Sequence, residues 1–150
     1  MFDSRPMTSE EAVALEALMA GEDAGYMMHF VGFSAPGQLQ DQLAEARQDV
    51  FMSIFSNNIL AGFYCLRGLD AGYARPSFGV YIQSRMKGLG LACASVRAAI
   101  AWCAAKSIPV LMLKVSWQNE GARRIYLESK FVEMAVCPDT LHVIMERVVD

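Results

Sequence analysis

"RMKGLG", residues 85–90, joins a stretch rich in aromatic and β-branched residues (78–82) to a long alanine-rich segment (90–106). Glycine lets the backbone approach a ligand closely, and the first amides of a helix are unpaired donors at the positive end of its dipole. Two glycines one residue apart, with basic residues beside them, therefore predict an anion site between a strand and a helix. The residues concerned are Arg85, Met86, Lys87, Gly88, Leu89 and Gly90.

Two well-known phosphate-binding loops do not fit this stretch. A P-loop requires GxxxxGK[ST], which the chain lacks. A Rossmann loop places Gly or Ala three residues beyond the second glycine, where this chain has Cys93, and an acid at the end of the next strand, where it has Val115. The hexapeptide alone is also compatible with a plain strand-to-helix turn that binds nothing.

The surrounding pattern predicts a mixed α/β domain with one parallel β-α-β crossover centred on residues 85–90. A hydroxyl followed by acids at Thr8-Ser9-Glu10-Glu11 indicates a helix start, and Gly21 a helix end. Residues 25–33 are ambiguous. Apolar periodicity and turn residues predict further helices at 38–47, 90–106 and 122–130, and strands at 2–7, 50–55, 59–66, 77–82, 109–115, 131–137 and 140–148.

The bulk composition excludes several classes of protein. With 150 residues, 54% of them hydrophobic, the chain is expected to fold as one domain over residues 1–150 rather than to be disordered. A net charge of −3 gives no general attraction to nucleic acid. The longest uncharged stretch, 50–66, is interrupted by turn residues, which argues against a membrane span, and no signal peptide is visible. The four cysteines lack metal-ligand spacing, so we expect reduced thiols, no metal and a cytoplasmic protein that acts on small molecules.

A second motif follows one strand later, in residues 114–131 (KVSWQNEGARRIYLESKF). Asn119 is followed by Ala122 three residues on and Tyr126 seven on, and Phe131 supplies a further aromatic residue. Together with the R/Q-x-x-G-x-G/A pattern of residues 85–90, this resembles the two signatures of the GNAT (Gcn5-related N-acetyltransferase) superfamily. The resemblance covers roughly residues 51–131 and departs from the family at Lys130, where glycine is usual. It implies the acyl-CoA N-acyltransferase fold, a central, mostly antiparallel sheet flanked by helices.

The resemblance also implies where acetyl-CoA, the acyl donor, would bind. The pantetheine arm is expected on the strand backbone at Phe78, Gly79 and Val80, the pyrophosphate on the amides of residues 85–90, and Asn119 is expected beside the pantetheine. An amide near Val80 would hold the oxyanion, and Tyr126 would protonate the leaving thiolate as general acid. A buried, packing role for Tyr126 is the alternative.

The general base stays open at this point. The strand 77–82 contains no carboxylate. Asp70 and Glu120 are candidates, and His29 has a suitable reference pKa, although a packed core histidine is the alternative.

The loop at residues 66–80 (LRGLDAGYARPSFGV) lies where this fold gathers its acceptor. Arg67, Asp70 and Tyr73 suit a small polar amine such as an amino sugar, as in sugar-modifying acetyltransferases of bacteria, although a solvated hairpin tip is equally compatible. A protein N-terminus or lysine is a second possible acceptor. Outside catalysis, the chain is compatible with an acyl-CoA sensor, or with an interaction subunit, and a homodimer is possible.

Overall fold

The computed structural model describes residues 1–28, 30, 33 and 35–150. Its centre is a seven-stranded sheet in the order β1-β2-β3-β4-β5-β7-β6, in which only β4 and β5 pair in parallel. This confirms the predicted mixed α/β fold with one parallel crossover. The strands are β1 (Phe2–Pro6), β2 (Val50–Ser56), β3 (Ile59–Arg67), β4 (Ser77–Ile82), β5 (Val110–Ser116), β6 (Val132–Val136) and β7 (His142–Val148).

The helices begin where side chains satisfy their first amides. Thr8 Oγ1 accepts a hydrogen bond from the Glu11 amide (3.1 Å) and the Glu11 carboxylate accepts one from the Thr8 amide (3.0 Å), which confirms the predicted helix start. Asn119 Oδ1 accepts from the Ala122 amide (3.3 Å), so α5 begins at Glu120, two residues before the predicted start. The helices are α1 (Ser9–Ala20), α2 (Ala24–Met27), α3 (Gln38–Glu45), α4 (Leu91–Ala105) and α5 (Glu120–Glu128), with a 3-10 turn at Ser84–Met86.

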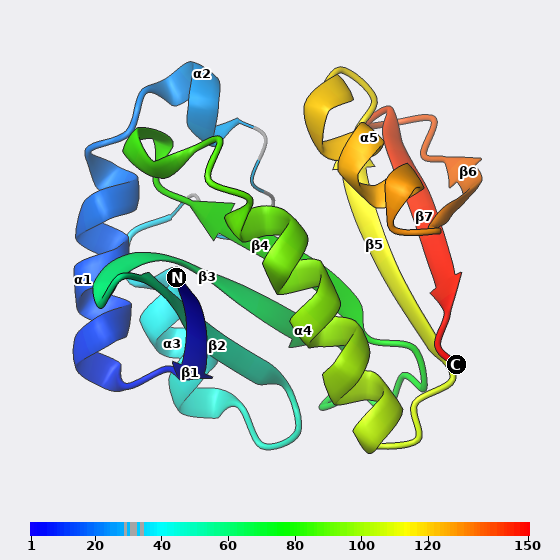
Figure 1. The fold of residues 1–150 in the computed structure, drawn as a ribbon, viewed down its shortest axis with the longest axis horizontal. Coiled ribbons are helices and arrows are strands. Elements are labelled where there is room, and N and C mark those ends of the chain that lie inside the picture. The colour runs from blue at the N-terminus through cyan, green and yellow to red at the C-terminus, as the bar shows by residue number, and fades with distance from the viewer. Residues whose placement is uncertain (29, 31–32, 34) are drawn as a thin grey trace.

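The sheet separates two hydrophobic cores, one on each face. The crossover helix α4 lies across the front of the sheet in Figure 1, and it packs with α5 on the first core, which includes Val96, Leu111 and Met145. Helices α1 and α3 cover the opposite face and bury Leu15 and Leu39 in the second core. None of the helices in the described ranges is both long and apolar enough to cross a membrane.

Strand β4 contributes side chains to both cores, because successive residues of a strand point to opposite faces of the sheet. Phe78 and Ile82 are buried in the core under α4, whereas Tyr81 is buried in the core under α1 and α3. Gly79 has no side chain, and a Cβ there would lie 3.2 Å from Cys65 Sγ. Strand β4 therefore contributes side chains to the cores on both faces of the sheet.

Candidate active site

The parallel pair β4–β5 separates soon after it forms. Only Ser77 with Met112 and Phe78 with Leu113 are paired within the described residues, and beyond them the two strands diverge, as Figure 1 shows. A cavity of about 1150 Å³ lies at this divergence. It is bordered by residues of both cores and by the predicted pantetheine-binding residues Phe78, Gly79 and Val80. The cavity therefore reaches the two faces of the sheet through the gap between the strands.

The loop at residues 85–90 lies at one edge of this cavity. Gly88 (φ +80°) and Gly90 (φ +75°) adopt left-handed conformations that side-chain-bearing residues rarely take, and no atom lies within 4 Å of where a Cβ would be built on either. Gly90 is the residue before α4, and no side chain caps that helix. Open backbone and uncapped amides at a helix N-terminus are suited to an anion. Of the six predicted residues, Met86, Lys87, Gly88 and Gly90 line the cavity, whereas Arg85 and Leu89 are exposed beside it.

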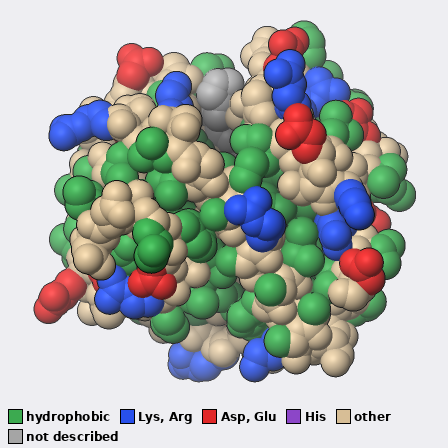
Figure 2. Space-filling view, in the orientation of Figure 1, with side chains coloured by type: hydrophobic (Ala, Val, Ile, Leu, Met, Phe, Trp, Pro, Cys, Tyr) green, Lys and Arg blue, Asp and Glu red, His purple; other side chains and the backbone are tan. Residues whose placement is uncertain are grey.

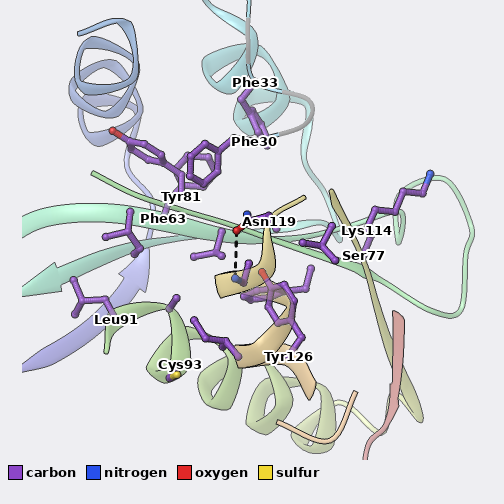
Figure 3. Close-up of a pocket in the computed structure, with 18 of the residues that line it drawn as sticks. Phe30, Phe33, Phe63, Ser77, Tyr81, Leu91, Cys93, Lys114, Asn119 and Tyr126 are labelled. Atoms are coloured by element: carbon purple, nitrogen blue, oxygen red, sulfur yellow. Dashed lines mark hydrogen bonds between the residues drawn. The ribbon is translucent and has the colours of Figure 1, made fainter. Parts of the chain in front are cut away.

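Tyr126 reaches the cavity from α5. Its side chain is 8% exposed and packs between the rings of Phe78 (centroids 6.3 Å apart) and Phe131 (5.8 Å). Figure 3 shows its hydroxyl pointing toward Asn119 and the space between β4 and β5. Burial raises the pKa of the Tyr126 phenol, so this group keeps its proton at neutral pH. A protonated phenol can donate a proton, which is the chemistry expected of it.

Asn119 lines the same cavity, and its position is fixed by the backbone. Its side-chain oxygen caps α5, and its amide donates to the Ser116 carbonyl (2.9 Å) at the end of β5. The structure thus brings together Tyr126, Asn119, the β4 residues and most of the glycine loop.

The residues predicted to bind the acceptor separate into two groups. Arg67 and Tyr73 line the cavity, but Asp70 does not. The Asp70 carboxylate accepts hydrogen bonds from the amides of Arg47 (2.9 Å), Gln48 (2.6 Å) and Asp49 (3.2 Å), and these bonds lower its pKa. Asp70 therefore holds the connection between α3 and β2 in place.

The two candidates for a general base that the structure describes, Asp70 and Glu120, do not line the cavity. No aspartate or glutamate is among the described residues that line it, and Glu120 is exposed elsewhere. His29 lies outside the described residues. Within the described ranges no group of three or more metal-ligating side chains comes together.

Glu22, which lies in the turn between α1 and α2, was not predicted as a site residue from the sequence. Its carboxylate accepts hydrogen bonds from the Tyr81 hydroxyl (2.8 Å), the Ser84 amide (2.8 Å) and the Ser84 hydroxyl (2.6 Å). Partial burial opposes ionisation, but these hydrogen bonds outweigh it and lower the pKa of Glu22, which makes it a poor base. Its role is to tie the α1–α2 turn to the end of β4.

The cavity is electropositive although the chain has a net charge of −3. The charged side chains among its described lining residues are Arg67, Arg75, Lys87 and Lys114. Arg75 forms an ion pair with Glu146, and the Lys87 ammonium lies 5.1 Å from the centre of the Tyr26 ring. Figure 2 shows the notch at the top of this face, where acidic as well as basic side chains lie at the surface, so the positive charge is that of the cavity lining itself. This charge favours an anionic ligand.

Solved structures of low sequence identity share this architecture. RimL, a ribosomal L7/L12 alpha-N-protein acetyltransferase solved with coenzyme A, superposes with a TM-score of 0.85 at 14% identity, covering 99% of this chain and 94% of its own. The aminoglycoside acetyltransferase AAC(6')-Ib, also with coenzyme A, gives 0.80 at 15% identity, with 99% and 95% covered. For yncA of Salmonella typhimurium, solved with acetyl-CoA, the values are 0.78 and 16%, with 99% and 94% covered. At such identities the likeness shows the fold alone.

The sequence itself identifies the family. No curated protein sequence matches the chain. Residues 19–131, however, match the Acetyltransferase (GNAT) family, a span that contains the glycine loop, Asn119 and Tyr126. The chain belongs to the GNAT family of acetyltransferases, and is an acyltransferase.

Proposed function

We propose that residues 1–150 form a single N-acetyltransferase domain that moves an acetyl group from acetyl-CoA to the primary amine of a small acceptor, with Tyr126 as general acid. The observation that carries the proposal is the cavity at the β4–β5 divergence, into which the buried, protonated phenol of Tyr126 points. Family membership supports acetyl transfer as the reaction.

The residues present fit acetyl-CoA as the acyl donor. The open backbone at Gly88 and Gly90 and the uncapped start of α4 suit a pyrophosphate, and Lys87 adds a charge-assisted donor. The β4 backbone pairs with β3 along one edge, but beyond Phe78 its other edge has no β5 partner. The polar groups on that edge therefore remain available to the amides of a pantetheine arm. No metal is needed by this chemistry, and we propose none.

The proposed reaction is a direct transfer. Acetyl-CoA supplies an acyl thioester, the neutral acceptor amine forms the new C–N bond, and the C–S bond breaks with its electron pair on sulfur. Tyr126 gives its proton to that sulfur and regains one from the nitrogen, which must lose a proton to become an amide. The products are the N-acetylated amine and free coenzyme A. Backbone amides of β4 near Val80 would stabilise the oxyanion.

The acceptor amine would lose its first proton to water rather than to a carboxylate. The described part of the cavity wall contains no acidic side chain that could serve as a base. The acceptor therefore has to be captured in its neutral form, or lose its proton to solvent at the mouth of the cavity.

The test is Tyr126→Phe, assayed by thiol release with an amine panel. We expect kcat to fall roughly 100-fold or more, as for loss of a general acid, with acetyl-CoA affinity unchanged. Tyr64→Phe is the matched control, because Tyr64 is also buried in the same core but does not line the cavity. Unchanged kcat in Tyr126→Phe would exclude its acid role, and acetyl-CoA binding without turnover of any amine would favour an acyl-CoA sensor instead.

A further inference from the structure

We propose, given the acetyltransferase function above, that the acceptor carries a carboxylate near its amine and an apolar body, as an apolar α-amino acid does. The carboxylate would bind the guanidinium of Arg67, and the apolar body would lie against the aromatic wall on the α1–α3 side of the sheet. This assigns the chemical class of the second substrate.

Arg67 is placed beside the expected reaction centre by the sheet register. In the β3–β4 ladder Cys65 lies opposite Gly79, and Arg67 lies two residues further along the same face of β3. A Cβ on Gly79 would lie 3.2 Å from Cys65 Sγ, so the thiol sits directly over that part of β4. Burial raises the pKa of the Cys65 thiol to about 11, and the neighbouring Arg67 guanidinium opposes this rise. The guanidinium is therefore close to both Cys65 and the face of Gly79.

The cation of Arg67 is only partly satisfied. Its guanidinium lies 4.7 Å from the centre of the Phe33 ring, and Nη1 donates to Gln42 Oε1 (3.3 Å). Its Nε is buried and has no hydrogen-bond partner in the part of the chain that the structure describes. Nor does Arg67 form an ion pair with any described carboxylate. Nε is out of a ligand's reach, so what the cavity offers is the rest of a half-buried guanidinium that forms no ion pair with a described carboxylate, and such a group is suited to bind the carboxylate of a ligand.

The acids on the neighbouring loops do not supply this carboxylate. Asp70 accepts three backbone amides, and Asp49 accepts the Asp70 amide (2.9 Å). Neither carboxylate forms an ion pair with Arg67, so its guanidinium is left to pair with the carboxylate of a ligand.

The wall next to Arg67 is aromatic and apolar. Phe33 packs edge-on against Phe63 (centroids 5.2 Å apart) and Phe30 edge-on against Tyr81 (5.3 Å), and Met19 and Tyr26 line the same side. Figure 3 shows Phe30, Phe33 and Tyr81 on the side of the sheet opposite Tyr126 and Cys93. Such a surface gains from burying an apolar group.

The same wall has little to offer the hydroxyl groups of an amino sugar. The Tyr26 hydroxyl donates to the Ile82 carbonyl, and the Tyr81 hydroxyl donates to Glu22 (2.8 Å). Both phenol O–H groups therefore already donate hydrogen bonds to protein acceptors and cannot donate to a sugar hydroxyl. Burying sugar hydroxyls without partners would be costly, which favours an apolar body over the amino sugar expected from the sequence.

The test compares acceptors that differ only in the carboxylate. Thiol release is measured with phenylalanine, phenylalaninamide, phenethylamine and glucosamine, on wild type, Arg67→Met and the surface control Arg97→Met. We expect phenylalanine to have a kcat/KM roughly 10- to 100-fold above the two analogues that lack the carboxylate. Arg67→Met should remove that preference, so that phenylalanine and phenethylamine reach similar kcat/KM values within the variant. A merely structural role of Arg67 would lower both values together and keep their ratio.

A binding measurement separates failure of this inference from failure of the proposed function. N-acetylphenylalanine and N-acetylphenethylamine are titrated by calorimetry into the coenzyme A-loaded protein, which requires no turnover. Tighter binding of the first, lost in Arg67→Met, would support the carboxylate site even in a protein that acetylates nothing. Equal binding of both, binding of neither, or a preference for glucosamine in the activity assay would overturn the inference.

Discussion

Tyr126 lies almost entirely out of solvent between Phe78 and Phe131, and this burial is what raises the pKa of its phenol above the ordinary value of about 10. The charged form of tyrosine is the phenolate, which an apolar environment disfavours. Tyr126 therefore keeps its proton as the pH rises past the point where a solvated tyrosine would lose it. A general acid placed in this way stays protonated over the whole neutral and moderately alkaline pH range.

The pH–rate profile tests that property. With an acceptor whose α-amine has a pKa of about 8, kcat/KM should increase with pH as the amine becomes neutral. It should then stay constant up to about pH 10. Circular dichroism over the same range checks that the protein stays folded. A descending limb that begins below pH 10 in a folded protein would show that the acid is not a buried phenol.

The positions of some cavity residues could be predicted from the sequence, and the partners of others could not. Asn119 and Tyr126 were predicted from the spacing of a motif that resembles a family signature, and both line the cavity, while their roles stay predictions. Asp70 was expected to face the acceptor because its loop does, but its carboxylate turns to the amides of residues 47–49, more than 20 positions away. Glu22 was missed because its hydrogen-bond partners, Tyr81 and Ser84, lie about 60 residues away in the sequence, and no local sequence pattern predicts those contacts.

Among the elements, strands and long helices were predictable because their apolar period and end signals agree. The hairpin of β2 and β3 and the capped start of α1 are examples. The four-residue α2 was not predicted, since the stretch at 25–33 shows no helical alternation of apolar and polar residues. The helix depends on a single cap, Asp23, whose carboxylate accepts the Gly25 amide (3.1 Å). Short elements of this kind are decided by packing rather than by periodicity.

Two glycines in different elements should respond oppositely to the same substitution. In Gly62→Ala of β3 the new Cβ would lie 1.9 Å from the Tyr81 carbonyl oxygen, so the strand must shift, and we expect a loss of about 3 kcal/mol or more in unfolding free energy. In Gly121→Ala of α5 the Cβ meets no atom within 4 Å, and helix propensity predicts a gain of about 0.5–1 kcal/mol.

Urea denaturation of both variants beside wild type measures the two changes on one scale. Gly62→Ala with wild-type stability would mean that β3 and β4 do not approach as closely as described. A destabilised Gly121→Ala would show that the start of α5 is crowded.

At the scale of the whole molecule, the fold joins two surfaces through one opening in the sheet. The α4–α5 side presents the glycine loop and Tyr126, and the α1–α3 side presents Arg67 and the aromatic wall. The divergence of β4 and β5 lets the two sides meet, so a donor and an acceptor can approach each other from opposite faces. The positive charge around this opening, in a chain that is negative overall, should attract coenzyme A electrostatically, and salt should weaken that attraction.

Calorimetric titration of the purified protein with acetyl-CoA, coenzyme A and NADH tests the central claim most directly. We expect acetyl-CoA and coenzyme A each to bind at one site per chain, more weakly at high salt and in Lys87→Met, and NADH not to bind. An absence of coenzyme A binding, or equally tight binding of NADH, would contradict the assignment of residues 85–90 and the cavity beside them to an acyl-CoA donor.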